Sequence, residues 1–213
     1  MSYLTRNNQS KVWTFGDSFS TNFDTYPSNI IEKYIKWKGY FPKTYAQIIA
    51  NRLNMEHVNY ARAGYDNYTI LQSICECSND INPNDLIIVG WTTPIRFRLV
   101  NDLDNWISIS QPLPKDFNED LLNEILINRL DNIARYANEV NAWIKLLDVS
   151  FKQNKIIQWS WDIESKLRLN YFTGFETISK ETNNMVCDGH YSENGHKELA
   201  NKIIETYNIK TLI

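Results

Sequence analysis

The sequence is poor in cysteine, in long apolar runs and in clustered positive charge. Its 213 residues include only Cys75, Cys77 and Cys187, and an odd count of this kind favours free thiols over a disulfide framework. No apolar run approaches the roughly 20 residues that cross a bilayer, and the first residues lack the apolar core of a signal peptide. We therefore expect a cytoplasmic protein with no membrane partner.

The charge pattern gives no indication of a nucleic-acid partner. Lys and Arg total 22, Asp and Glu total 25, and the net charge is -3. No segment collects the positive charges into the stripe that a phosphate backbone requires. No Cys and His cluster has zinc spacing. With 43% hydrophobic and 22% charged residues, the chain has the composition of a globular protein.

Short apolar runs alternate with helical periodicity along the chain. We predict strands at 11–16, 56–62, 86–92 and 155–161, and helices at 41–54, 68–78, 118–152 and 193–207. This alternation predicts an α/β domain over residues 1–213, with a central parallel sheet between two helical layers. The segments 20–40, 96–117 and 163–186 fit this pattern poorly, and we interpret them as insertions near the strand ends, where ligands bind.

Residues that can do chemistry gather where the predicted strands end. The four segments are FGDSFS around Ser18, NYARAG ending at Gly64, VGWTT around Thr92, and DGHYSENGHKELA around His190. In an open parallel sheet these ends converge on one crevice. A serine there is a weak nucleophile unless a base accepts its proton and a third group orients the base. Asp17 is expected to hold the turn through bonds to the backbone.

These four blocks resemble those of the SGNH hydrolases, also called the GDSL lipase/esterase family. The resemblance covers nearly the whole chain and implies the three-layer, flavodoxin-like fold of that family, with a central parallel sheet of about five strands. It also implies a catalytic triad of Ser18, His190 and Asp188. The oxyanion would be held by the backbone amides of Ser18 and Gly64 and by the hydroxyl of Thr92.

The sequence departs from the family at two of these positions. Thr92 stands where the family has asparagine, in a Gly-Trp-Thr version of the block, followed by Arg96, that resembles small bacteriophage members. A phage-encoded chain would act in the host cytoplasm or in the virion. Asp188 is two residues before His190 instead of three, so Asp162, at the end of the fourth predicted strand, is the alternative triad acid.

The resemblance implies a serine esterase that needs no metal or organic cofactor. Trp91, Trp159 and Trp161 lie at or near predicted strand ends, where their rings would suit a sugar or another flat group, or would belong to the core. Arg96 would bind an anionic group or pair with an acid. An acetyl ester on a carbohydrate is the expected substrate. The alternatives are an acyltransferase with the same serine, or a non-catalytic glycan-binding module on the same fold.

Overall fold

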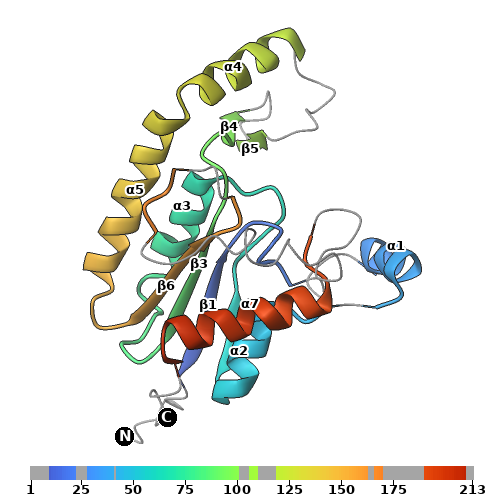
Figure 1. The fold of residues 1–213 in the computed structure, drawn as a ribbon, viewed down its shortest axis with the longest axis vertical. Coiled ribbons are helices and arrows are strands. Elements are labelled where there is room, and N and C mark those ends of the chain that lie inside the picture. Colours follow the sequence, from blue (N-terminus) through green and yellow to red (C-terminus); the bar gives the residue numbers. More distant parts are fainter. Residues whose placement is uncertain are drawn as a thin grey trace, which may run out of the picture.

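The structure is a computed structural model, and its core is a parallel sheet of four strands in the order β2-β1-β3-β6 (Figure 1). It describes residues 10–22, 28–40, 42–100, 106–109, 119–162, 166–169 and 190–209. The strands are β1 (Lys11–Gly16), β2 (Glu56–Asn59), β3 (Leu86–Trp91) and β6 (Lys155–Ser160). The α/β class and the parallel sheet are as predicted, with one strand fewer than expected among the described residues.

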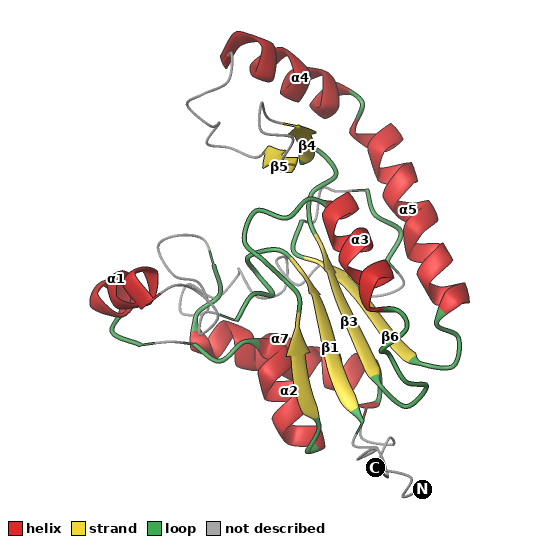
Figure 2. Ribbon diagram, turned by 180° about the vertical axis from the view of Figure 1, so that it is seen from behind, coloured by secondary structure: helices red, strands yellow, loops and turns green. Residues whose placement is uncertain are grey.

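Helices cover both faces of this sheet, which makes three layers (Figure 2). One face is covered by α2 (Tyr45–Leu53) and α7 (Glu193–Thr206), and the other by α3 (Asn67–Cys77) and α5 (Ile133–Ser150). Strands β1 and β3 are buried almost throughout, so their successive side chains enter opposite cores. Val12 and Ile88 pack towards α2 and α7, whereas Phe15 and Val89 pack towards α3 and α5. The period of two along each strand thus builds two separate cores.

The predicted helix over 118–152 is two helices in the structure. Helix α4 (Glu119–Asp131) ends where α5 begins, and between them Asn132 has φ -111° and ψ 21°, outside the helical region. The Asn132 side chain donates to the carbonyl of Asn128 at 2.9 Å. A short amide that bonds the nearby backbone competes with the helical pattern, which the apolar periodicity of the segment does not show.

Two segments expected to lack regular structure contain some. Helix α1 (Ser28–Lys38) lies within 20–40, and the antiparallel pair β4 (Phe97–Val100) and β5 (Trp106–Ile109) lies within 96–117. Both lie away from the central sheet (Figure 1). Strands β4 and β5 have only four residues each, which leaves little room for a periodic pattern. Helix α1 does carry apolar residues at helical spacing, at Ile30, Ile31, Tyr34 and Ile35, and this signal was overlooked.

Arg129, near the end of α4, connects this helix to the segment that follows β3 through three hydrogen bonds. Its Nε donates to the carbonyl of Ile95 at 2.9 Å, and its Nη2 donates to those of Pro94 at 2.8 Å and Arg96 at 3.2 Å. Its guanidinium lies 3.8 Å from the ring centre of Tyr136 on α5. Burial lowers the pKa of Arg129 from its ordinary value, yet the three carbonyls still hold a cation at the base of α4.

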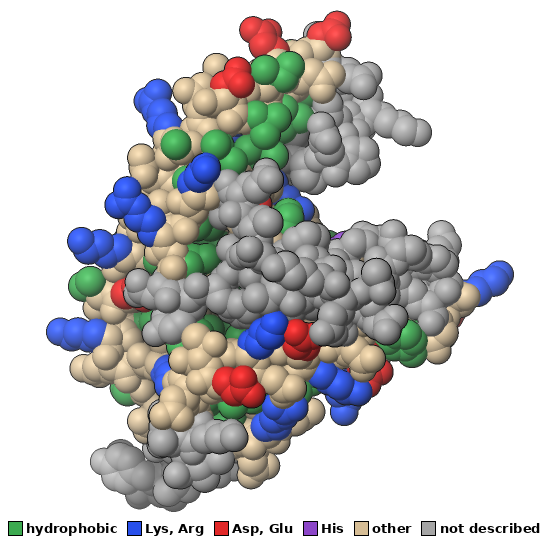
Figure 3. Space-filling view, in the orientation of Figure 1, with side chains coloured by type: hydrophobic (Ala, Val, Ile, Leu, Met, Phe, Trp, Pro, Cys, Tyr) green, Lys and Arg blue, Asp and Glu red, His purple; other side chains and the backbone are tan. Residues whose placement is uncertain are grey.

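The surface carries charges of both signs. Acidic and basic side chains are interleaved over α7 (Figure 3), where Lys197 pairs with Glu193 at 2.6 Å and Lys202 pairs with Glu198 at 2.9 Å. Among the helices that the structure describes, none is both long and apolar enough to cross a membrane.

Candidate active site

The serine and the histidine of the predicted triad lie in contact at the carboxyl end of the sheet. Ser18 follows β1 in a turn closed by the amide of Ser20, which donates to the carbonyl of Asp17 at 3.0 Å. The Ser18 Oγ lies 2.9 Å from the Nε2 of His190, although the two residues are 172 positions apart. Ser18 is half-buried, so its hydroxyl is within reach of a ligand.

The fold explains why these two residues meet. Strand β1 lies between β2 and β3 in the sheet, so the chain runs from β1 to β2 on one side and then reverses direction to form β3 on the other side. This reversal is the topological switch point, where open parallel sheets form their ligand crevice. His190 stands just before α7, whose start is fixed by Ser192, because its hydroxyl accepts the amide of Gly195 at 3.1 Å.

Asp17 holds the turn in place through its side chain, which is buried with 1% exposed. Its Oδ1 accepts the amide of Phe19 at 3.1 Å, the backbone bond that the sequence leads us to expect. Its Oδ2 accepts the Nη1 of Arg96 and the Nε1 of Trp161, both at 2.9 Å. Of the two roles considered for Arg96, the structure shows the pairing with an acid.

The backbone amides of Ser18 and Gly64 are the two predicted to hold an oxyanion. The amides of Ser18 and Gly64 have no hydrogen-bond acceptor within the described part of the chain. The loop that carries Gly64 is docked on β1, because the amide of Arg62 donates to the carbonyl of Gly16 at 3.1 Å. Gly64 has φ +83°, a left-handed conformation that disfavours any residue with a Cβ. A tetrahedral intermediate needs donors that are free to bind its oxyanion, so the role predicted for these two amides stays a prediction.

Thr92, the third predicted oxyanion donor, is in a different situation. Its backbone is held by Asn67 at the start of α3, which accepts the Thr92 amide at 2.8 Å and donates to the Thr92 carbonyl at 2.9 Å. Its Oγ1 is shielded from solvent and has no hydrogen-bond partner among the described residues. The structure therefore shows a fixed backbone at Thr92 and a hydroxyl that no ligand contacts without a local rearrangement.

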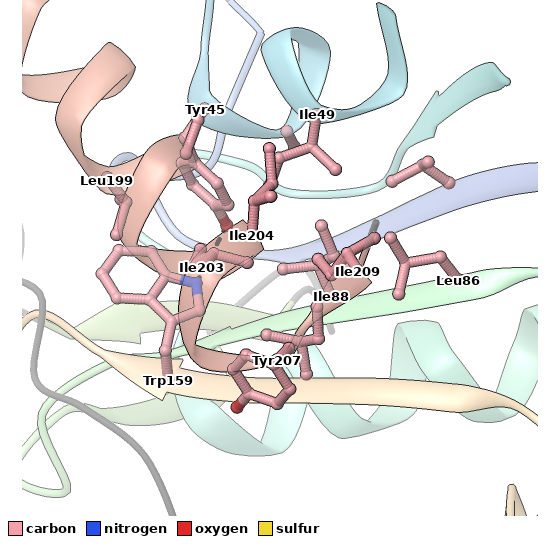
Figure 4. Close-up of a cluster of buried hydrophobic side chains, with 14 of the residues drawn as sticks. Tyr45, Ile49, Leu86, Ile88, Trp159, Leu199, Ile203, Ile204, Tyr207 and Ile209 are labelled. Atoms are coloured by element: carbon pink, nitrogen blue, oxygen red, sulfur yellow. Dashed lines mark hydrogen bonds between the residues drawn. The ribbon is translucent and has the colours of Figure 1, made fainter. Parts of the chain in front are cut away.

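Two of the three tryptophans proposed as substrate contacts are core residues. Trp91 and Trp159 are both 0% exposed. Trp91 donates to the Oε1 of Gln158 at 2.9 Å, and Trp159 packs against Tyr45 in the core beneath α2 and α7 (Figure 4). Of the two roles considered for these rings, contact with substrate or part of the core, the structure shows the second. Both positions face the interior because the ends of β3 and β6 are still covered by helices.

Trp161, the third of these tryptophans, lies close to the catalytic pair. It is half-buried, and its ring stacks on Phe19 with the centres 4.9 Å apart. The ring of Phe19 also lies 4.9 Å from the imidazole of His190. Phe19, which the sequence did not single out, thus lies between the base and Trp161 and keeps this side of the site apolar.

A buried chain of hydrogen bonds lies beneath the turn that carries Ser18, and the sequence did not predict it. The Oγ of Ser20 lies 2.9 Å from the hydroxyl of Tyr45, which accepts the Nε1 of Trp159 at 3.0 Å. Ser20 fits here only because the neighbouring strand ends are glycines. A Cβ on Gly16 would lie 2.7 Å from the Ser20 Oγ, and one on Gly90 would lie 2.6 Å from it. The glycine at each strand end is the sequence signal that could have revealed this contact.

The other two histidines are occupied by structural bonds. His57 Nε2 lies 3.0 Å from the Thr14 Oγ1, and its Nδ1 lies 3.4 Å from the Asn22 amide nitrogen. Burial lowers the pKa of His57 to about 4, so its ring is neutral at pH 7. His196 is buried, and its Nδ1 accepts the amide of Tyr45 at 3.3 Å.

Of the two candidate triad acids, only Asp162 is among the residues that the structure describes. Asp188 lies outside the described residues. Asp162 lies just beyond β6, half-buried, and its amide donates to the Ser160 Oγ at 3.1 Å. Within the described ranges, no three His, Cys, Asp or Glu side chains gather as metal ligands would.

A cavity of about 450 Å³ lies beside Arg96, between α3, α5 and the segment that follows β3. Tyr68 and Trp143 line it, with their rings edge to face at 6.0 Å. The volume is within the range of small-ligand sites.

No family model and no curated protein sequence matches the chain, but its structure is similar to solved structures. A member of the lipolytic G-D-S-L family from Veillonella parvula is 15% identical, with a TM-score of 0.42 over 93% of this chain and 98% of the other. A GDSL-like lipase from Parabacteroides merdae is 14% identical, with a TM-score of 0.49 over 94% and 96%. A carbohydrate esterase with divergent catalytic and non-catalytic binding functions is 13% identical, with a TM-score of 0.47 over 97% and 70%. The likeness to bacteriophage members stays a prediction.

Proposed function

We propose that the protein is a serine esterase that cleaves short acyl esters, with acetyl esters as the principal substrates. The observation that carries this proposal is the 2.9 Å contact between the Ser18 Oγ and the His190 Nε2. A hydroxyl hydrogen-bonded to an imidazole is the arrangement that turns serine into a nucleophile.

The proposed reaction has two steps. Ser18 attacks the acyl carbonyl while His190 accepts its proton, and the two backbone amides hold the oxyanion. His190 then protonates the leaving alcohol, and the acyl group remains on Ser18. Water, deprotonated by His190, attacks this acyl-enzyme, and the acid is released as Ser18 regains its proton.

A carbohydrate is the proposed alcohol part of the ester. The cavity that Arg96 lines supports this, because it has room for a ring and is also lined by the aromatic side chains of Tyr68 and Trp143, and aromatic rings suit the faces of a sugar. The guanidinium of Arg98 covers one face of the Tyr68 ring, 3.7 Å from its centre. Trp161, half-buried near His190, is the remaining candidate for a direct contact with the substrate.

The test is hydrolysis of p-nitrophenyl acetate together with labelling by a fluorophosphonate probe. We expect turnover and one covalent adduct, both abolished in Ser18→Ala. Ser78→Ala is the matched control, because Ser78 is an exposed serine whose hydroxyl donates to the carbonyl of Cys75 at 2.7 Å, and it should behave like the wild type. Equal turnover by wild type and Ser18→Ala would refute the proposal, and a folded wild type that neither turns over nor labels would favour a binding module.

The orienting acid is tested in the same assay. Loss of the acid should lower kcat by several orders of magnitude, because the imidazole loses its correct tautomer. We propose Asp188 for this role, so Asp188→Asn should be the damaging change and Asp162→Asn the mild one. The reverse result would assign the role to Asp162.

A further inference from the structure

Arg96 makes two hydrogen bonds with one nitrogen atom. Its Nη1 donates to the Oδ2 of Asp17 at 2.9 Å and to the carbonyl of Tyr65 at 3.3 Å. The Arg96 side chain is 16% exposed and that of Asp17 is 1% exposed. Little water therefore screens this ion pair, and both partners are held more firmly than surface charges would be.

The two groups that Arg96 joins are next in sequence to Ser18 and Gly64, whose amides have no acceptor among the residues that the structure describes. Asp17 precedes Ser18, and Tyr65 follows Gly64, so one guanidinium connects the nucleophile turn to the loop after β2. We infer that Arg96 is a positioning residue that sets the separation of the Ser18 and Gly64 amides, and thereby the geometry of the oxyanion site. This inference rests on the proposed esterase function.

The surroundings of Arg96 favour this role over direct binding of a substrate anion. Its Nη1 is committed to Asp17 and Tyr65, and its Cζ lies 5.8 Å from the ring centre of Trp161. Trp161 in turn donates to the same Asp17 oxygen at 2.9 Å. The charge of Arg96 is therefore balanced within the protein. A ligand carboxylate would meet a guanidinium whose charge is already paired with the buried carboxylate of Asp17.

Arg96 is not the only residue that holds the Gly64 loop, so replacing it should reduce kcat only in part. The amide of Arg62 also holds the Gly64 loop to β1, through the carbonyl of Gly16 at 3.1 Å. Loss of Arg96 should loosen the loop without releasing it. A complete loss of one oxyanion donor costs about 100- to 1000-fold in kcat, so a displaced donor should cost about 10- to 100-fold. The Michaelis constant should change little, because these amides act mainly as charge develops in the transition state.

The experiment compares wild type, Arg96→Met, Arg96→Lys and Arg96→Ala with p-nitrophenyl acetate. Arg52→Met is the matched control, because Arg52 is an exposed arginine of α2 whose Nη1 donates to the Asn201 Oδ1 at 2.6 Å. Phenylboronic acid supplies the second measurement, since its tetrahedral adduct with a serine places an oxygen where the oxyanion would form. Circular dichroism and a thermal melt show which variants are folded.

We expect kcat to fall by about 10- to 100-fold in Arg96→Met with a nearly unchanged KM. The inhibition constant of phenylboronic acid should rise by a similar factor, and millimolar guanidinium should restore part of the activity of Arg96→Ala. A purely structural loss would reduce the amount of folded protein without these signatures. If Arg96→Met does not fold, Arg96→Lys, which keeps a positive charge beside Asp17, decides with the same readouts.

Two results would overturn the inference. One is a wild-type kcat in a folded Arg96 variant, and the other is a raised KM with kcat unchanged, which would make Arg96 a substrate-binding residue. If the wild type is active and the Arg96 variants are unaffected, the inference alone fails. If the wild type has no esterase activity, the proposed function fails and this inference fails with it.

Discussion

Replacing Tyr45 by phenylalanine should measure how much the buried chain beneath Ser18 stabilises the fold. Tyr45 is 0% exposed, and its hydroxyl accepts the indole N–H of Trp159 at 3.0 Å and lies 2.9 Å from the Ser20 Oγ. The substitution keeps the ring, which packs edge-on against Trp159 with the centres 5.2 Å apart. It removes only the oxygen, so the change in stability reports the two hydrogen bonds.

The expected cost follows from what the change leaves behind. Trp159 would keep a buried N–H without an acceptor, at about 1–3 kcal/mol, and the bond to Ser20 adds about 0.5–1.5 kcal/mol. We therefore expect the free energy of unfolding to fall by about 1.5–4.5 kcal/mol and the Tm to fall by about 3–18 °C. Urea titration measures the first quantity and calorimetry the second.

The control for Tyr45→Phe is Tyr68→Phe. The Tyr68 side chain is 50% exposed, so its hydroxyl can exchange a protein partner for water, and the change should stay within about 0.5 kcal/mol. A loss below about 1 kcal/mol in Tyr45→Phe, or a loss equal to that of the control, would show that the hydroxyl is dispensable and would refute the reasoning.

Two further predictions concern the packing and the protonation of the same region. Gly90→Ala would place a Cβ 2.6 Å from the Ser20 Oγ and 3.2 Å from the Trp159 Nε1, so overpacking should cost about 1–3 kcal/mol in a urea titration; an unchanged midpoint would contradict this contact. The pKa of His57 is lowered from 6.5 to about 4 in the folded protein, so the unfolded chain binds the extra proton as the pH falls. The contribution of His57 to the free energy of unfolding is complete above about pH 6.5, is lost towards pH 4 and amounts to at most about 3 kcal/mol. His57→Gln should therefore give a flatter curve of the free energy of unfolding against pH over this window. An equally steep curve would assign the pH dependence to other groups.

The sheet could be predicted from the sequence because its strands are locally unambiguous. The run LIIVGW of β3 is continuously apolar and buried at every position, a pattern typical of a strand covered on both faces. The strand ends then indicated which residues would meet, and Ser18 and His190 lie in contact although nothing local connects them.

The side-chain environments at these strand ends could not be predicted in the same way. An aromatic residue at the end of a strand faces either the crevice or a core, and the choice depends on how far the covering helix extends. At Trp91 and Trp159 the helices extend far enough to bury both rings completely. The contact of Arg96 with Asp17 spans 79 positions, and a single sequence offers no pattern that would pair these two charges.

The bonds of Arg129 have a consequence for how such a protein can evolve. Arg129 Nη2 reaches the carbonyl of Arg96, 33 positions earlier, at 3.2 Å, so the excursion that contains β4 and β5 begins and ends at one point. Insertions or deletions within a segment whose two ends are fixed together add little to the entropy of closing it. New substrate preferences could therefore arise by lengthening or exchanging this excursion, while Ser18, His190 and the strand ends that hold them are inherited unchanged.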